Sequence, residues 1–314
     1  MTRSPDQLLR DALAIWHAGV DAVRSDRLVR NVLRIEGEML WVGEQAVDLS
    51  CIGRIAVVGG GKAGAGMAAA VEQILGPERM ERKHVEGWLN VPADCAGQLS
   101  RIHLHAARPA GVNEPRPEGV HGSRELLRIV ESLGPNDLCL CLISGGGSAL
   151  MPAPVEGITL TDKLAVTRFL SAAGATINEL NTVRKQLSQL KGGGLARACR
   201  AGRLITLIIS DVLGDPLDII ASGPTVPDDS STPAAALAVL ERFGAADSLP
   251  PAIFQYLEQR ESDGPIARKE AVRAEVSNII IGNNATAVDA AGCEADRLGY
   301  SAAMTSATES EGLA

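Results

Sequence analysis

The chain has 314 residues, 46% of them hydrophobic and 22% charged, which is typical of a globular protein with one large domain or two modest ones. Its formal net charge of −8 excludes the basic surface that binds nucleic acid or an anionic membrane, so we expect neither as a partner. None of the six cysteines forms a Cys-x-x-Cys pair and no apolar run reaches membrane-spanning length, so we expect a cytoplasmic protein with reduced thiols.

The chain begins with the signals of an amphipathic helix. Ser4 is placed to cap it, Pro5 fits the first helical position, and Gln7 completes a capping-box pattern. The apolar side chains that follow recur at helical spacing and predict one stripe, made of Leu8, Leu9, Ala12, Leu13, Trp16 and Val20. We expect residues 1–50 to form this helix and a lead-in, both packed on the main domain.

From about residue 50, short apolar segments alternate with helical ones. The expected strands are 55–58, 101–105, 138–143, 204–209 and 278–281. The expected helices are 64–75, 119–132, 161–173, 178–190, 233–243 and 284–298. Most of the strand segments are continuously apolar, as in strands that are covered on both faces. The pattern predicts an α/β fold with a doubly wound, mainly parallel sheet and helices on both faces.

Several residues are expected to have structural roles. Cys139 and Cys141 lie two apart in a predicted strand, which indicates buried thiols on one face rather than metal ligands. His103 and His105 lie on another predicted strand and are expected to pack or to face an edge. Two stretches rich in proline are expected to be surface loops, at 106–117 and 222–233.

Four predicted strands end in loops rich in glycine or small polar residues, at 59–62, 144–148, 210–215 and 282–284. The carboxyl ends of parallel strands meet at one edge of the sheet, where ligands bind. Glycine lets backbone amides approach a ligand, and such amides favour an anion. For any single loop a tight turn without a ligand is the alternative. We predict phosphate or substrate binding by Gly60, Gly61, Ser144, Gly145, Gly146, Gly147, Ser148 and Asn283.

Lys62 follows the first glycine turn, where an ammonium can pair with phosphate or carboxylate oxygens, and we predict a catalytic role for it. The spacing is not that of a P-loop. Residues 59–64 do fit the dinucleotide pattern G-x-G-x-x-G. The acidic residue expected about 20 positions further on is missing, because the segment VEGWLNV ends in Asn90 and Val91.

Two carboxylates follow the strand at 204–209. Asp211 and Asp215 lie in a loop that faces the predicted phosphate loops, so both are candidate Mg²⁺ ligands, and Asp211 is also a candidate catalytic residue. A capping or turn role is the alternative for both, because Asp often has this role at the ends of strands and helices.

Three cations lie close together in the segment NTVRKQLSQLKGGGLA at 181–196. Arg184, Lys185 and Lys191 are expected on one helix that ends at Gly192, with Arg184 and Lys191 on the same face. We predict a positive cluster for an acidic substrate, with Arg184 in a catalytic role. Simple stabilisation of a helix C-terminus by positive charge is the alternative.

Taken together, these segments resemble the glycerate kinases of the MOFRL type. The resemblance rests on GGGKAGAGMA at 59–68, LISGGGSALM at 142–151, LNTVRKQLSQLKGGGLA at 180–196, LIISDVLGDPLDIIASGPT at 207–225 and IIGNNATAVDAA at 280–291. It implies that residues 51–314 form a Rossmann-like N-terminal domain and that Lys62 is an active-site lysine. It also implies ATP with Mg²⁺ as cofactors and phosphorylation of D-glycerate to 2-phosphoglycerate.

The chain departs from this family at Gln186, where a histidine is usual, and in the loop at 105–117. The family continues with a C-terminal domain that closes over the crevice, and no such domain follows here. The last residues, SAAMTSATESEGLA, stop after what resembles one more strand. We therefore expect an interrupted chain with little or no kinase activity of its own.

Two other functions stay open at this stage. One is a NAD-dependent oxidoreductase that uses the GGGKAG loop, and the other is a non-catalytic module that binds nucleotides or sugar phosphates. The expected partners are glycerate and ATP, and a homodimer is left open.

Overall fold

The structure is a computed structural model that describes residues 3–228, 230–263 and 273–301. Its centre is a six-stranded parallel sheet with the order β6-β5-β4-β7-β8-β9. The strands are β4 (Ile55–Gly60), β5 (Glu86–Pro92), β6 (Ile102–Arg108), β7 (Leu138–Ile143), β8 (Arg203–Ile209) and β9 (Glu275–Gly282). Counted from β4, this is the order 3-2-1-4-5-6 of a Rossmann sheet, so the predicted doubly wound α/β fold is confirmed.

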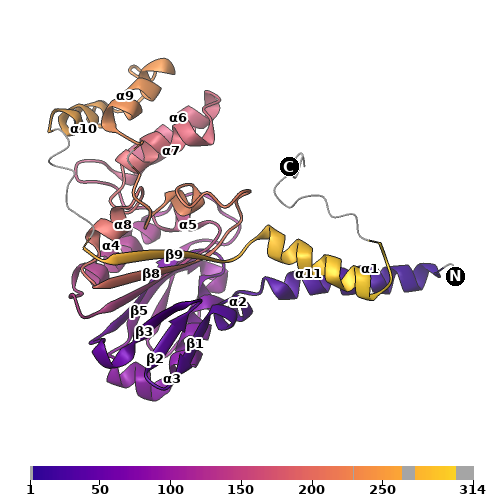
Figure 1. Cartoon of the computed structure of the whole chain (residues 1–314). Helices are drawn as coiled ribbons and strands as arrows, with labels where there is room; N and C mark the ends of the chain where they lie inside the picture. Colours follow the sequence, from indigo (N-terminus) through magenta and orange to yellow (C-terminus); the bar gives the residue numbers. More distant parts are fainter. Residues whose placement is uncertain (1–2, 229, 264–272, 302–314) are drawn as a thin grey trace.

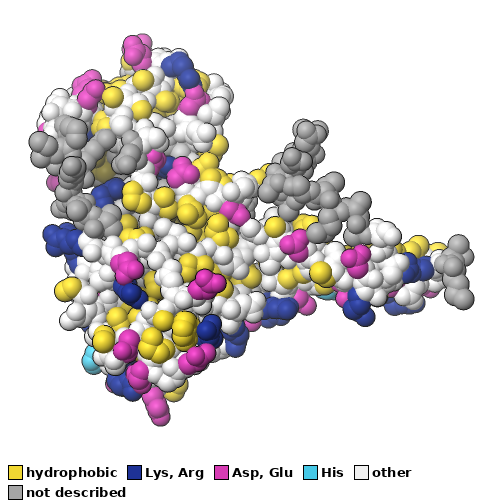
Figure 2. Space-filling view, viewed as in Figure 1, with side chains coloured by type: hydrophobic (Ala, Val, Ile, Leu, Met, Phe, Trp, Pro, Cys, Tyr) yellow, Lys and Arg dark blue, Asp and Glu magenta, His cyan; other side chains and the backbone are white. Residues whose placement is uncertain are grey.

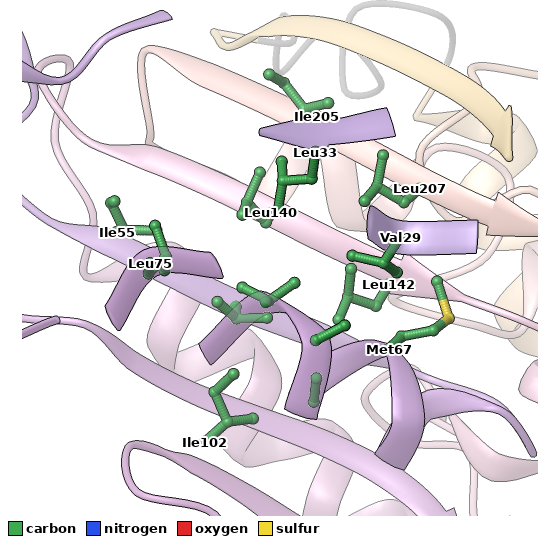
Figure 3. Packing of buried hydrophobic residues seen from close by; sticks show 14 of the residues in the cluster. Val29, Leu33, Ile55, Met67, Leu75, Ile102, Leu140, Leu142, Ile205 and Leu207 are labelled. Atoms are coloured by element: carbon green, nitrogen blue, oxygen red, sulfur yellow. The ribbon is translucent and has the colours of Figure 1, made fainter. Parts of the chain in front are cut away.

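Helices cover both faces of the sheet. On one face lie α2 (Ser25–Val32) and α3 (Gly64–Arg82), and on the other lie α4 (Pro117–Glu131) and the short α8 (Gly194–Ala198). Figure 3 shows the first layer, in which side chains from the strands and from these helices interlock, among them Val29, Met67, Leu75, Leu140, Leu142 and Leu207. Cys139 and Cys141 point into the second layer and are fully buried, as the sequence predicted.

The lead-in contains a small sheet that the sequence analysis did not predict. Strands β1 (Leu33–Glu36), β2 (Met39–Val42) and β3 (Gln45–Asp48) form an antiparallel meander. Its inward side chains, among them Leu40, Val42 and Val47, belong to the same core cluster as α2 and α3. This sheet therefore extends the first core layer.

A second group of helices has its own core. It consists of α6 (Leu160–Ala172), α7 (Ile177–Gln186), α9 (Pro233–Arg242) and α10 (Pro251–Ser262), and Figure 1 shows these helices together on one side of the sheet. Val166, Leu170, Val183 and Leu240 are among its fully buried side chains. From this group, Arg184 of α7 reaches Ser148 in the loop after β7.

The first and last described helices form an arm. α1 (Pro5–Ala22) packs along α11 (Asn284–Arg297), and the pair projects away from the body (Figures 1 and 2). The Ser4 cap is present, with the Gln7 amide donating to the Ser4 hydroxyl over 3.3 Å. The predicted apolar stripe faces outward, because Trp16 is 58% exposed and Leu9 is 63% exposed.

The N-terminal helix α1 packs mainly on α11. The rest of the lead-in, which is α2 and the small sheet, packs on the main sheet. The further strand expected at the end of the chain lies outside the described residues. Among the residues that the structure describes, none of the helices combines the length and the hydrophobicity that crossing a membrane requires.

Candidate active site

The candidate site lies at the carboxyl edge of the sheet, where the loops after β4, β7 and β8 meet. The chain leaves β4 toward β5 on one side and the sheet continues through β7 on the other, so the crevice forms where the strand order reverses. The loop at 144–148 occupies the middle, between the loops that follow β4 and β8. Each predicted site residue can therefore be placed by its relation to this loop.

The first glycine loop, 59–64, is bound to its neighbours through its own amides. Its hydrogen bonds run from the amides of Gly61, Lys62 and Ala63 to the Asn90 carbonyl, the Gly145 carbonyl and the Ser144 hydroxyl, at 3.1, 2.9 and 3.0 Å. Side chains are excluded by close packing, because a Cβ atom on Gly61 would lie 2.0 Å from the Ser144 hydroxyl oxygen. Nucleotide contacts by Gly60, Gly61 and Ser144 remain predictions, since the described contacts of these residues are within the protein.

The second glycine loop, 144–148, leaves amides open. Within the described parts of the chain, the amides of Gly145 and Gly146 donate no hydrogen bond. Gly146 has a φ of 80°, in the left-handed region that favours glycine, and this turns the chain into the four-residue α5 (Gly147–Leu150). The carbonyl of Gly147 accepts a hydrogen bond from the Met151 amide within the turn.

Two cationic side chains converge on Gly146. A Cβ atom added there would lie 3.3 Å from Cε of Lys62 and 3.0 Å from Nη2 of Arg108. Lys62 is exposed, and its ammonium has no hydrogen bond or ion pair in the described part of the chain. The structure thus places the predicted lysine beside the open amides, together with an arginine that the sequence analysis had assigned to a surface loop.

The predicted carboxylates lie on the other side of the same loop. Asp211 is exposed and contacts Gly145, where an added Cβ atom would lie 2.2 Å from its Oδ2. Asp215 accepts a 2.5 Å hydrogen bond from Nδ2 of Asn283, and Asn283 also caps α11. All three line a cavity of about 570 Å³. Within the described ranges, no group of three or more His, Cys, Asp or Glu side chains is arranged to hold a metal ion.

Ser148, at the end of the loop, is the meeting point of the second cation cluster. Its hydroxyl accepts hydrogen bonds from Nη2 of Arg184 at 2.5 Å and from Nζ of Lys191 at 2.6 Å. The same Lys191 ammonium donates to the Ser148 carbonyl at 2.9 Å, and the Ser222 hydroxyl lies 3.1 Å from that of Ser148. The structure therefore brings Arg184, Lys191 and Ser148 together.

In the part of the chain that the structure describes, the positive charges around Ser148 have no carboxylate partner. Burial lowers the pKa of Arg184. Burial and, next, the charge of Arg184 hold the pKa of Lys191 well below its usual value and bring that of Lys163 to about 7. No Asp or Glu oxygen of the described chain lies within 4.0 Å of these three groups. Buried charge without a partner is unfavourable, so this cluster is suited to an anionic ligand.

Lys185, the fourth cation of this region, differs from its neighbours. Its ammonium lies 2.5 Å from Asp228 and 3.4 Å from Asp218, and its side chain is buried. Burial alone would raise the pKa of Asp228, but hydrogen bonds from Lys185, Ser230 and Ser231 outweigh it and lower that pKa. The charge of Lys185 is therefore neutralised within the protein, and its predicted contact with substrate remains a prediction.

The predicted helix at 178–190 was too long. Helix α7 ends at Gln186, because the Lys163 ammonium takes the Leu187 carbonyl at 2.6 Å and the chain turns at Gly192 and Gly193, both with positive φ. Lys191 consequently lies in the turn, and the expectation that it shares a helix face with Arg184 was wrong. It reaches the same serine from the turn.

Three residues of the site were not predicted from the sequence: Arg108, Lys163 and Ser222. Arg108 carried no signal, because the predicted strand ended at residue 105 and residues 106–117 were expected to be a surface loop, whereas in the structure Arg108 is the last residue of β6. The sequence gives no signal that Lys163 belongs to the site, since this residue lies inside a helix that begins with a regular capping box. Ser222 has a positive φ of 62°, which its sequence does not announce.

The chain is similar to one protein family and to several known proteins. The sequence profile of a family described as "Domain of unknown function (DUF4147)" matches residues 11–258. The glycerate kinase of Danio rerio is 39% identical over 302 residues, which are 92% of this chain and 59% of that protein. A protein of Agrobacterium vitis named "Putative hydroxypyruvate reductase" is 46% identical over 200 residues, 61% of this chain and 42% of its own length.

A solved structure gives the same picture. The crystal structure of a glycerate kinase from Thermotoga maritima matches with a TM-score of 0.75 and 32% identity, over 94% of this chain and 64% of that one. The chain therefore spans less than two thirds of the length of these relatives.

Proposed function

The chain belongs to the DUF4147 family, and from this premise we propose that it carries the catalytic crevice of a glycerate kinase. The reaction transfers the γ-phosphoryl group of ATP to the 2-hydroxyl of D-glycerate and yields ADP and 2-phosphoglycerate. The observation that supports this most directly is the meeting of open amides, unpaired cations and one exposed carboxylate around the loop at 144–148. The relatives that are named glycerate kinase agree with the proposal.

Phosphoryl transfer depends mainly on positioning and on neutralising charge. In the proposed reaction the hydroxyl oxygen of glycerate bonds to the γ-phosphorus, the bond from that phosphorus to ADP breaks, and the hydroxyl proton passes to water. The amides of Gly145 and Gly146 and the ammonium of Lys62 would hold oxygens of one anionic group. Arg184 and Lys191 would hold the second anionic group beside Ser148.

ATP would enter as its Mg²⁺ complex, with Asp211 as the protein ligand of the ion. Mg²⁺ is commonly held by one or two carboxylates together with phosphate oxygens and waters. Asp211 fits this role because it is exposed and contacts Gly145 of the central loop, whereas Asp215 is already hydrogen-bonded to Asn283. The ion, when bound, neutralises charge on the phosphate oxygens.

A coupled assay tests the proposal. ADP formation is measured with ATP, Mg²⁺ and D-glycerate, and product identity is checked with an enzyme that consumes 2-phosphoglycerate. We expect calorimetric heat when Mg-ATP or D-glycerate is added alone, and at most slow ADP formation that depends on D-glycerate, because little or no kinase activity is expected of this chain. Omission of D-glycerate is the control for ATP hydrolysis. Absence both of turnover and of heat with either ligand would contradict the proposal.

The name of the Agrobacterium vitis relative favours a reductase as the second candidate. The contacts of the GGGKAG loop argue against a dinucleotide there, because three of its amides are occupied within the protein. Asn90, at the position where an acidic ribose ligand is expected, is fully buried and donates to the carbonyls of Gly119 and Leu150. We expect no oxidation of NADH or NADPH with hydroxypyruvate, and a steady absorbance decrease would favour the reductase.

A further inference from the structure

Arg108 is delivered to the crevice by a local irregularity of the sheet. β5 and β6 pair in register up to Val91 and Ala106, and then Pro92 pairs with Arg108, so that Ala107 is an extra residue on β6. A bulge of this kind bends a strand and re-aims the side chains that follow it. The bulge therefore places the guanidinium of Arg108 toward the crevice.

The surroundings of Arg108 leave its charge without a partner. The residue is 4% exposed, and burial lowers the pKa of its guanidinium, with Asp94 opposing this from a distance. Nη1 donates to Oδ1 of Asn113 at 2.7 Å, while the buried Nε has no hydrogen-bond partner. Within the described ranges, no carboxylate oxygen lies within 4.0 Å of this guanidinium. A cation held in this way is suited to an anion that arrives from solution.

The free side of Arg108 faces the same point as Lys62. Nη2 of Arg108 and Cε of Lys62 approach Gly146 from two different loops, and a Cβ atom there would lie within 3.0 and 3.3 Å of them. The open amides of Gly145 and Gly146 adjoin this point. Asn113 fixes the plane of the guanidinium through Nη1, which leaves Nη2 available to a ligand.

We propose that Arg108 and Lys62 bind one oxyanion between them, over Gly146, so that Arg108 is a substrate-binding residue of the transfer reaction. The oxyanion is a phosphate group of the nucleotide or the carboxylate of the hydroxy acid. The proposal rests on the proposed function for the identity of the ligands, whereas the anion site itself rests on the contacts of Arg108, Lys62 and Gly146. The alternative is that Arg108 only supports the loop that contains Asn113.

The experiment measures binding to the chain by calorimetry with three probes: Mg-ADP, D-glycerate and inorganic pyrophosphate. The variants are Arg108→Gln, Arg108→Lys and Lys62→Met. The matched control is Arg101→Gln, which removes an arginine at the opposite end of β6 that pairs with exposed Glu81. We expect Arg108→Gln to raise the Kd of one probe roughly tenfold to hundredfold, the range for a hydrogen bond to a charged group. Arg108→Lys should lose only part of this affinity, and Lys62→Met should weaken the same probe.

The melting temperature of each variant separates binding from support of the loop. We expect Arg108→Lys to have the melting temperature of the wild type and to bind the affected probe more weakly. If Arg108→Gln does not fold, the comparison of Arg108→Lys with wild type separates the two roles. The proposal is overturned if wild type binds none of the probes, if Arg108 variants bind as tightly as wild type, or if Arg108 and Lys62 variants weaken different probes. Binding of pyrophosphate or Mg-ADP that depends on Arg108, without any binding of D-glycerate, would keep this site and reject the glycerate kinase.

Discussion

Two triglycine loops of this protein look alike in sequence and differ in the use of their amides. Each follows a buried strand of the central sheet, and each is the type of loop that predicts a phosphate site. In the loop at 59–64 three consecutive amides are bound to neighbouring loops, whereas in the loop at 144–148 the amides of Gly145 and Gly146 are open. In the first loop glycine allows close packing against neighbouring segments. In the second loop glycine leaves backbone amides accessible to a ligand. A triglycine motif therefore indicates a ligand only where its N–H groups have no partner in the protein.

The largest expected effect is the loss of turnover in Lys62→Ala. The amides of the loop at 59–64 are occupied within the protein, so the Lys62 ammonium is the group of this loop that can act on a ligand. Removal of one preorganised charge from a transfer site typically lowers turnover by roughly a hundredfold to a thousandfold. Since Lys62 is exposed, the free energy of unfolding of the Lys62→Ala variant should differ from that of wild type by less than about 0.5 kcal/mol. D-glycerate-dependent ADP formation by a complete enzyme that contains this chain measures the first effect, and urea unfolding of the chain measures the second. Rates like those of wild type would remove Lys62 from the mechanism.

Gly61→Ala tests the packing role of the first loop. The new Cβ would lie 2.0 Å from Oγ and 2.7 Å from the backbone nitrogen of Ser144, so the two loops must separate. We expect a loss of about 2–4 kcal/mol in the free energy of unfolding, as for other overpacked buried sites. Gly97→Ala is the matched control, because nothing lies within 4 Å of its added Cβ. Stability equal to that of the control would mean that the loops are not tightly packed.

Gly146→Ala tests whether an anionic ligand binds over the loop at 144–148. The positive φ of 80° makes alanine unfavourable there by about 1–2 kcal/mol, and the methyl group would occupy the space between Lys62 and Arg108. We expect roughly tenfold weaker binding of an anionic ligand in addition to this loss. Gly157→Ala shares a positive φ of 79° without any neighbour within 4 Å, so it should lose stability and keep affinity. If both variants bind equally well, the space over Gly146 is not a binding site.

Lys163 affects stability alone, in a way that depends on pH. Its folded-state pKa of about 7 lies below the value near 10.4 that is usual for an unfolded chain. Between these pH values the unfolded chain binds more protons, so stability rises with pH, by at most about 1.4 kcal/mol per unit. Below about pH 7 both states are protonated and the dependence ends. We expect urea unfolding at pH 7 and pH 9 to show this rise in wild type and not in Lys163→Met, and equal slopes would contradict it.

Most of the fold could be predicted because its signals are local. Apolar segments predicted most strands of the central sheet, helical periodicity predicted most of the helices, and strand–helix alternation predicted a parallel sheet. The three short strands of the lead-in were missed because four-residue strands, only partly buried, carry too little periodicity. The end of α7 was missed because it is set by Lys163, from a different helix.

The site could be predicted only at the level of loops. Glycines after apolar strands pointed to the correct edge of the sheet, but the two triglycine loops could not be told apart, because their hydrogen bonds join distant segments. Lys185 and Lys191 are close in sequence, and only the carboxylates of Asp218 and Asp228, which come much later in the chain, distinguish a paired cation from an unpaired one. Arg108 required the bulge between β5 and β6, which its sequence does not reveal.

The pairing of α1 with α11 has a consequence for how the molecule is made. Gly19 contacts Ala287 closely, and the phenol of Tyr300 donates to Asp11 over 2.7 Å, so α1 finds its partner only after the described chain up to α11 has been synthesised. A lone helix of 18 residues is marginally stable in water, and closing so long a loop is entropically unfavourable. Among the described elements, the arm should therefore become ordered late during translation, and until then the apolar stripe of α1 stays exposed without a partner helix.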